Sequence, residues 1–330
     1  MDNLTHTLFA LAMAKGGLEQ VTPRATAALL IGANLPDIDL VTLFWGNIHY
    51  LDYHRGFTHS ILGIILGALI LAVIIYWANH LIRKAPLPPA LWRLFLVALA
   101  GTASHLLLDY TNSYGIRPLL PFNGQWFAWD IVFIVDPWIL LILFLGLGLP
   151  FLFRLVTQEI GARATSYKPG ALTCLLLVVA YWGAKDISHR SSLQELQSRN
   201  FTTGEPIRLA ALPQFFNPFG WYGVVETQTS YHMTFVGWSL YQDGNDHRRI
   251  RMVHKMEPGE ILENAGHGQQ AKAFLDFARF PLFQVTPSPA GYEVSVRDLR
   301  FDFASRVRKR FLCTIVLDKN LKIVSEEFRY

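Results

Sequence analysis

The run of residues 60–80, SILGIILGALILAVIIYWANH, contains no formal charge and consists largely of Ile, Leu and Ala. About 20 apolar residues in a helix are enough to cross the hydrocarbon core of a bilayer. A soluble domain rarely contains a helix that is apolar on all sides, because one side normally faces water. Arg83 and Lys84 follow the run directly. The chain is therefore predicted to be an integral membrane protein.

Further apolar stretches repeat this pattern along the first half of the chain. Three long ones cover residues 94–108, 131–153 and 170–184. Two shorter ones, 4–14 and 25–35, are separated by the turn Lys15-Gly16-Gly17 and predict a short helical hairpin. The chain starts with acidic Asp2 and has no basic n-region, so we expect no cleaved signal peptide.

Charged residues are distributed unevenly and mark a domain boundary. The first 186 residues contain 21 Lys, Arg, Asp and Glu residues, whereas the remaining 144 contain 33. The second value is close to the quarter that is usual for soluble domains. We therefore expect a membrane-embedded helical domain over residues 1–186 and a soluble domain over 187–330. The net charge of +4 is too small and too dispersed to suggest nucleic acid as a partner.

The C-terminal part has the pattern of a mostly β (α+β) domain. Alternating or β-branched runs at 222–225, 231–241, 291–296 and 311–317 predict strands, and one helix is expected from Gln269 to Phe277. The aromatic stretch 215–222 fits core packing, with a docking surface or membrane contact as alternatives. Cys174 and Cys313 suggest neither a disulfide framework nor a thiolate metal site.

Basic residues between the apolar stretches predict the orientation of the protein. They fall in three connections: Lys15 and Arg24; Arg83, Lys84 and Arg93; and Arg154, Arg163 and Lys168. Positive connections remain in the cytoplasm. Residues near 37–59 and 109–130 are then on the outer face of the membrane, together with the C-terminal domain.

Five polar clusters interrupt the apolar half, and all fall near this outer face. They are Asn3-Leu4-Thr5-His6, residues 34–39 (NLPDID), residues 54–60 (HRGFTHS), residues 105–109 (HLLLD), and Asp136 with Asp130 before it. Each has a structural explanation of its own, as helix caps, turn residues or solvated loop side chains. Asn3 or Thr5 is a candidate cap of the first helix, Ser60 of the first long span, and Asp130 or Asp136 of a later one.

His105 and Asp109 fit a structural explanation least well. Their i, i+4 spacing puts both on one helical face. The residues around them are Ala, Leu and Thr, and an ionisable pair at membrane depth is costly and therefore a functional candidate. A histidine and an aspartate one turn apart also suit chelation of one metal ion.

The clusters together predict a metal site. Imidazoles come from His6, His54 or His59, and His105, and carboxylates come from Asp37 or Asp39 and from Asp109. This donor set suits Zn, Mn or Fe, and its size makes one or two ions plausible, with Asp37 or Asp39 as a bridge. Asp39, His54 and Arg55 are the candidate catalytic residues. Arg55, and more weakly Arg117, is a candidate phosphate contact.

The segments DNLTH, LPDID, HRGFTHS and HLLLDYTNSYG, in this order, resemble the YdjM-like membrane-bound metal-dependent hydrolases over roughly residues 1–150. The same order is distantly similar to zinc-dependent phospholipases C, which are all-helical enzymes with a multi-zinc site. The resemblance implies a location in the inner (plasma) membrane. It also implies these metal ligands: His6, Asp37, His54 or His59, His105 and Asp109. The chain lacks a clear HxxxE partner and the N-terminal Trp ligand of those phospholipases, so one or two ions, with zinc favoured, are expected.

The predicted function is a membrane hydrolase that uses a divalent metal on a phosphoester of a lipid or another membrane-proximal substrate. A transporter or ion pathway is an alternative, since intramembrane His and Asp also act as relays. However, the middles of the long stretches, 64–75 and 140–149, contain no ionisable residue. A structural or regulatory membrane protein with a partner-binding C-terminal domain is a third possibility. The sequence does not predict an oligomeric state.

Overall fold

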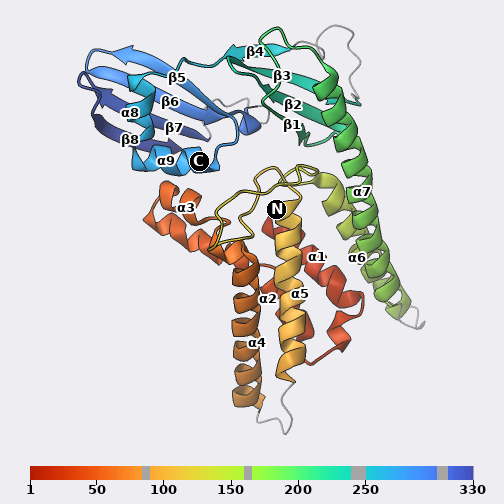
Figure 1. Cartoon of the computed structure of the whole chain (residues 1–330). Helices are drawn as coiled ribbons and strands as arrows, with labels where there is room; N and C mark the ends of the chain where they lie inside the picture. Colours follow the sequence, from red (N-terminus) through yellow and green to blue (C-terminus); the bar gives the residue numbers. More distant parts are fainter. Residues whose placement is uncertain (84–89, 160–165, 239–249, 303–310, 330) are drawn as a thin grey trace. The chain divides into compact units, whose positions relative to one another are not determined.

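The computed structural model describes residues 1–83, 90–159, 166–238, 250–302 and 311–329 (Figure 1). These residues divide into two compact units. The first comprises Met1–Asp39 and Arg55–Ile187, and the second comprises Leu40–His54 and Ser188–Tyr330. Lys84, Arg163 and the end of the strand expected at 231–241 lie outside the described residues.

The first unit is helical. Its helices are α1 (Asn3–Lys15), α2 (Ala25–Gly32), α4 (Ile61–Arg83), α5 (Leu91–Tyr110), α6 (Pro137–Glu159) and α7 (Lys168–Ser198), the last of which continues into the second unit. Short 3-10 segments are η1 (Leu18–Gln20), η2 (Pro36–Trp45, which continues into the second unit) and η3 (Phe57–His59). Helices α4 to α7 are each long and apolar enough to cross a membrane, and α2 with η2 makes a fifth if it is one broken span. The predicted four spans after a short helical hairpin are confirmed.

Helix starts differ from the sequence expectations in two places. Asp2, not Asn3 or Thr5, caps α1, because its carboxylate accepts the Thr5 backbone N–H at 3.0 Å. Asp136 caps α6 and accepts the N–H of Ile139 at 3.1 Å, so residues 131–135 of the expected apolar stretch precede the helix. The cap role predicted for Asp130 is wrong, because no helix starts there in the described chain; its φ is +60°.

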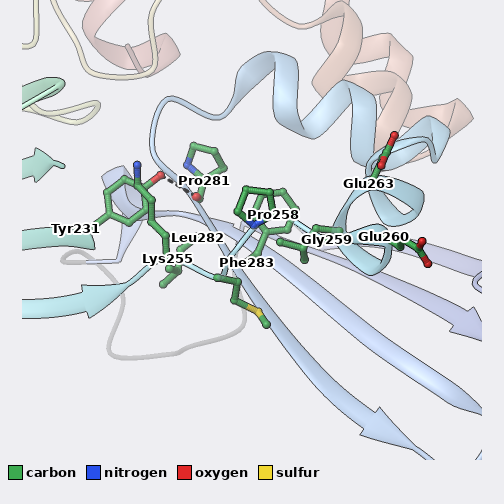
Figure 2. A pocket seen from close by; sticks show the side chains of 11 residues that line it. Tyr231, Lys255, Pro258, Gly259, Glu260, Glu263, Pro281, Leu282 and Phe283 are labelled. Atoms are coloured by element: carbon green, nitrogen blue, oxygen red, sulfur yellow. Dashed lines mark hydrogen bonds between the residues drawn. The ribbon is translucent and has the colours of Figure 1, made fainter. Parts of the chain in front are cut away.

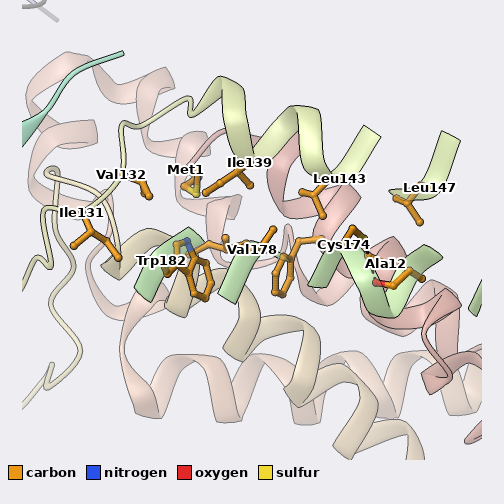
Figure 3. Close-up of a cluster of buried hydrophobic side chains, with 13 residues drawn as sticks. Met1, Ala12, Ile131, Val132, Ile139, Leu143, Leu147, Cys174, Val178 and Trp182 are labelled. Atoms are coloured by element: carbon orange, nitrogen blue, oxygen red, sulfur yellow. Dashed lines mark hydrogen bonds between the residues drawn. The ribbon is translucent and has the colours of Figure 1, made fainter. Parts of the chain in front are cut away.

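Small residues bring the helices of the first unit close together. A Cβ atom at Gly101 of α5 would meet the Leu29 carbonyl oxygen of α2 at 2.7 Å. One at Gly146 of α6 would meet Cys174 of α7 at 2.3 Å. Around Cys174 these two helices share an apolar cluster with α1 (Figure 3). Close approach of this kind is typical of helix pairs in membranes, where hydrophobicity alone does not drive association.

Gly101→Ala tests the packing of α2 against α5. We expect the folded state to lose about 1–3 kcal/mol, because the new methyl group overlaps the Leu29 carbonyl. Gly148→Ala is the matched control, since a side chain there meets nothing within 4 Å in the described part of the chain. Thermal unfolding in detergent should show a lower Tm for Gly101→Ala only. Equal Tm values for the two variants would contradict this packing.

The second unit contains two antiparallel four-stranded sheets. The first, in the order β1-β2-β3-β4, is formed by Arg208–Pro213, Gly220–Glu226, Ser230–Gly237 and Arg251–His254. The second, in the order β5-β6-β7-β8, is formed by Pro281–Ser288, Gly291–Asp298, Leu312–Asp318 and Ile323–Arg329. Helices α8 (Glu260–Gly266) and α9 (Gln269–Phe277) contact the second sheet, and α3 (Asn47–Tyr53) packs on α9. The predicted soluble domain of strands with helices is confirmed as an antiparallel two-sheet α/β plait.

The first sheet is covered on both faces, as its alternating side chains require. One face packs Trp221, Val225 and Val236 against Leu196 of α7. The opposite face packs residues such as Val224 against the second sheet. Four strands that the sequence patterns predict are present, and β1, β4, β5 and β8 are additional to them. The helix expected at Gln269–Phe277 is confirmed.

Candidate metal centre

Four buried donor residues from three elements of the first unit converge on one point. They are Asp37 at the start of η2, His59 at the end of η3, and His105 and Asp109 on α5. One donor atom of each lies within 4.8 Å of the others. The i, i+4 pair on α5 brings His105 Nε2 within 3.3 Å of Asp109 Oδ2. The predicted pair therefore points to the same centre as two donors from distant parts of the chain.

The two imidazoles face each other through their Nε2 atoms, which are 3.0 Å apart. His105 Nδ1 is 2.7 Å from the carbonyl oxygen of Ala33, the residue that directly follows α2. A carbonyl oxygen only accepts hydrogen bonds, so Nδ1 of His105 donates. In the neutral ring Nε2 then carries its lone pair toward the centre.

His59 is oriented in the same way by a second hydrogen-bond network. The Thr58 hydroxyl donates to Asp39 Oδ2 at 3.1 Å, and its oxygen lies 3.1 Å from His59 Nδ1. Asp39 Oδ2 is itself 3.3 Å from His59 Nδ1. Because the hydroxyl proton is used on Asp39, Nδ1 of His59 is the donor to both oxygens. The Nε2 lone pair of His59 therefore also points at the centre.

The carboxylates complete this donor set. Asp109 Oδ2 is 3.2 Å from His59 Nε2, and among the described residues it has no hydrogen-bond partner. Asp37 Oδ1 is 3.5 Å from Nε2 of both histidines. The other oxygen of Asp37 accepts a hydrogen bond from Asn3 Nδ2 at 3.0 Å, which fixes the carboxylate. Two carboxylate oxygens thus adjoin two imidazole lone pairs.

His6 lies beside this group. Its ring stacks on His105 with centroids 3.8 Å apart, and its Nε2 is 3.5 Å from Asp109 Oδ1. The ring is fully buried, and neither of its nitrogens has a hydrogen-bond partner within the described ranges. The α-amino group of Met1 contacts the same Asp109 oxygen. His6 is therefore adjacent to the four-donor group without belonging to it.

Arg55 is buried and directed at protein groups. Its Nη2 donates to Asp109 Oδ1 at 2.9 Å, and its Nη1 donates to Asn112 Oδ1 at 3.0 Å and to the Gly115 carbonyl at 3.1 Å. Its backbone N–H donates to Asp39 Oδ2 at 3.0 Å, with φ at +56°. These contacts position both aspartates. The predicted phosphate contact of Arg55 stays a prediction.

The remaining predicted residues lie apart from the four-donor group or belong to the second unit. His54 ends the segment that belongs to the second unit, where its ring stacks on Tyr50 at 4.4 Å. Its roles as ligand and catalytic residue stay predictions. Arg117 lies over the Trp126 ring at 4.6 Å. Asp136 caps α6 and accepts a hydrogen bond from the Tyr181 hydroxyl at 3.2 Å.

Several groups that shape the centre were not predicted. They are the Ala33 carbonyl, Thr58, Asn3, Asn112 and the Gly115 carbonyl. Backbone carbonyls leave no signal in a sequence. Asn3, Thr58 and Asn112 do lie within or next to the polar segments DNLTH, HRGFTHS and HLLLDYTNSYG, so their position beside the candidate ligands was the available signal.

A separate pocket of about 750 Å³ lies within the second unit (Figure 2). Two of its polar side chains are engaged with neighbouring protein atoms: Lys255 pairs with Glu226 at 2.7 Å, and the Tyr231 hydroxyl donates to the Pro281 carbonyl at 2.9 Å. Burial raises the pKa of Tyr231. This pocket therefore offers weaker chemistry than the four-donor group.

Comparisons with known proteins support the organisation of the chain. The sequence model of a family described as YdjM inner membrane protein matches residues 1–190, and one described as YfhP C-terminal alpha/beta plait domain matches residues 260–330. The chain is also 25% identical over 319 residues to a protein named Uncharacterized protein YfhP from Bacillus subtilis (strain 168). That alignment covers 91% of this chain and 87% of the relative. No solved structure matches, and the resemblance to zinc-dependent phospholipases C stays a prediction.

Replacing Arg55 tests whether it positions Asp109. We expect Arg55→Ala to lower stability by about 3–5 kcal/mol, because it removes the guanidinium group that pairs with the buried Asp109 carboxylate. Arg55→Lys should restore little, since an ammonium group does not reproduce the three-way contact of the guanidinium fork. Thermal unfolding of the purified variants in detergent measures both. Wild-type Tm values for both variants would instead favour a role limited to substrate binding.

Proposed function

Because this chain belongs to the YdjM inner membrane protein family and carries a buried group of Asp and His donors, we propose that it is a metal-dependent hydrolase of the inner membrane. Its substrate in this proposal is a phosphoester of a lipid or of another molecule at the membrane surface. The proposed ligands are Asp37, His59, His105 and Asp109, with His6 next to them.

The observation that carries the proposal is the approach of the His59 and His105 Nε2 atoms to 3.0 Å, with two carboxylate oxygens beside them. Without a cation, four electron-rich atoms at this spacing repel one another. A zinc ion with ligands at 2.0–2.1 Å in tetrahedral geometry separates those ligands by about 3.3 Å. The separations given above between the imidazole nitrogens and their neighbours, 3.0–3.5 Å, agree with that value.

The donor set fits zinc best, with manganese or iron as alternatives, and one or two ions. A metal ion bound there supplies Lewis-acid chemistry: it lowers the pKa of a water molecule toward neutrality and polarises a phosphoryl oxygen. The surrounding residues serve it indirectly. Asp39 and the Ala33 carbonyl hold the two imidazoles in the ligating tautomer. Loss of such a hydrogen-bond partner of a ligand typically lowers metal affinity 10–100-fold. Arg55 holds Asp109 in place.

Exposed apolar side chains support a lipid or membrane-proximal substrate. Leu4, Ile38 and Phe57 each lie between polar residues of the candidate site segments, and 45–61% of their surface is exposed. Leu107 lies between His105 and Asp109 on α5 and is also exposed. Interleaved apolar and polar residues suit a site at the interface between bilayer and water. A water-soluble phosphoester would not require these exposed apolar side chains beside the site.

The metal content of purified protein tests the proposed site. We expect about one ion per chain in the wild type, or two if the larger donor set is used. His105→Ala and Asp109→Ala should both abolish binding, because each removes a donor from the four-donor group. His80→Ala, which replaces an exposed histidine near the end of α4, is the control and should keep the ion. Elemental analysis measures the stoichiometry.

The same proteins separate a hydrolase from a structural metal site. Purified protein in lipid vesicles should release the phosphorylated or dephosphorylated product from a panel of phospholipids, and chelation should stop release until Zn²⁺ is restored. A metal-free wild type overturns the site. If the bound metal raises Tm but no phosphoester of the panel is hydrolysed, the proposed hydrolase activity is overturned and the ion has a structural role.

We further propose that the second unit lies on the outer side of the membrane, as the basic connections predict. Ile207→Cys provides a suitable probe, since 64% of the Ile207 surface is exposed. Both native cysteines are buried, and burial, with a smaller contribution from Glu326, raises the pKa of Cys313 to about 12. An impermeant maleimide should therefore label Ile207→Cys in right-side-out vesicles and much less in inside-out vesicles. The reverse pattern would invert the proposed topology.

A further inference from the structure

The chain between α5 and α6 contains an ordered hairpin that belongs to the first unit (Figure 1). Ile116 and Phe127 pair as an antiparallel bridge, and each donates its N–H to the carbonyl of the other at 2.9 Å. At the turn, the Phe122 N–H donates to the Leu119 carbonyl at 3.0 Å. We call residues 118–125 the hairpin tip.

The hairpin tip presents apolar side chains without any charge among them. Phe122 is 88% exposed and Leu119 is 41% exposed. The stretch 118–129, PLLPFNGQWFAW, contains no charged residue. A group of exposed apolar side chains is typical of a surface that contacts lipid or another protein.

The base of the hairpin is packed against the residues that surround the four-donor group. Arg117 is buried and lies over the Trp126 ring at 4.6 Å. The Trp126 and Tyr114 rings meet edge to face, with centroids 6.3 Å apart, and Arg55 lies over Tyr114 at 4.6 Å. Guanidinium groups are attracted to aromatic faces in this arrangement. The stack therefore connects the hairpin to Arg55, which holds Asp109.

One hydrogen bond defines the level of the hairpin tip along the helices of the first unit. The N–H of Ile61, the first residue of α4, donates to the Pro118 carbonyl at 2.9 Å. The apolar span of α4 covers Ile61–Leu81. Pro118 therefore lies beside the point at which this span begins, which is the boundary between hydrocarbon and headgroups.

The exposed side chains are close to this boundary. Leu119 follows Pro118 directly, and a turn of this kind keeps the Cα atoms of Leu119 and Phe122 within about 7 Å of each other. The headgroup region on each side of a bilayer is about 5–8 Å thick. Contacts within the first unit alone therefore bring the hairpin tip within reach of the headgroups.

We propose that the hairpin tip inserts into the headgroup region of the bilayer that α4 crosses. Phe and Leu side chains favour the boundary between headgroups and acyl chains, where interfacial segments bury apolar groups about 5–10 Å deep. Because the tip has no charge, insertion requires no desolvation of an ionised group. The tip thereby holds the hairpin, and through its stack Arg55, at the lipid surface. The lipid contact is independent of the proposed hydrolase activity.

Fluorescent labels test the proposal in full-length protein. Phe122→Cys and, separately, Leu119→Cys are labelled with NBD and reconstituted in phosphatidylcholine–phosphatidylglycerol vesicles. The control of known depth is Ile70→Cys on α4, since 59% of the Ile70 surface is exposed. At 1.5 Å per residue it lies about 14 Å from Ile61, near the middle of a hydrocarbon core about 30 Å thick. Wild-type protein measures background labelling, which should be low because both native cysteines are buried.

We expect the tip labels to show blue-shifted emission and little quenching by iodide present on both sides of the membrane. A nitroxide at the headgroup should quench them more strongly than one in the middle of the acyl chain. The label at position 70 should show the reverse preference, and the same preference at the tip would contradict a headgroup location.

Two further results overturn the proposal. Tip labels that iodide quenches as strongly as NBD-cysteine in buffer face water. Tip labels shielded from iodide and from both nitroxides contact protein instead of lipid. Unchanged Tm values for the labelled variants confirm that the fold is retained.

Discussion

The candidate site of the helical unit depends on one close approach: the Nε2 atoms of His59 and His105 lie 3.0 Å apart. Each ring is held by an acceptor on its far side, the Ala33 carbonyl for His105 and the Asp39 carboxylate for His59. The Ala33 carbonyl reaches His105 only because α2 and α5 pack closely at Gly32 and Gly101. Helix packing and the chemistry of the centre thus depend on the same pair of small residues.

The site illustrates which parts of a functional centre are local in sequence. His105 and Asp109 were predictable because a helix places residues four apart on one face. Asp37 and His59 were predictable because charged and polar residues are rare in the apolar half, which makes each one noticeable. The distances among the four donor residues depend on how η2, η3 and α5 pack, and the sequence patterns could not predict these distances. The contacts of Arg55 were missed for the same reason.

The fold shows a similar division between local and distant information. The four spans follow from apolar length alone. Strand β8 was missed because most of its residues are exposed. Apolar and polar residues therefore do not alternate along it. Asp130 was assigned to a helix start on the general preference of carboxylates for that position. The helix begins later because Pro137, which lacks an N–H, suits its first turn and Asp136 precedes it.

The sequence of α7 changes along the helix from an apolar part to a part that packs on the first sheet. Its apolar residues up to 184 suit lipid, whereas Leu196 further on packs against the first sheet. The sheet in turn separates the aromatic residues next to it: those within β2 alternate between two covered faces, whereas Phe215 and Phe216 lie in the loop before Gly220. Trp221 is therefore a core residue, while Phe216, five positions earlier, is exposed. Composition alone does not distinguish the two, because the difference arises where the strand begins.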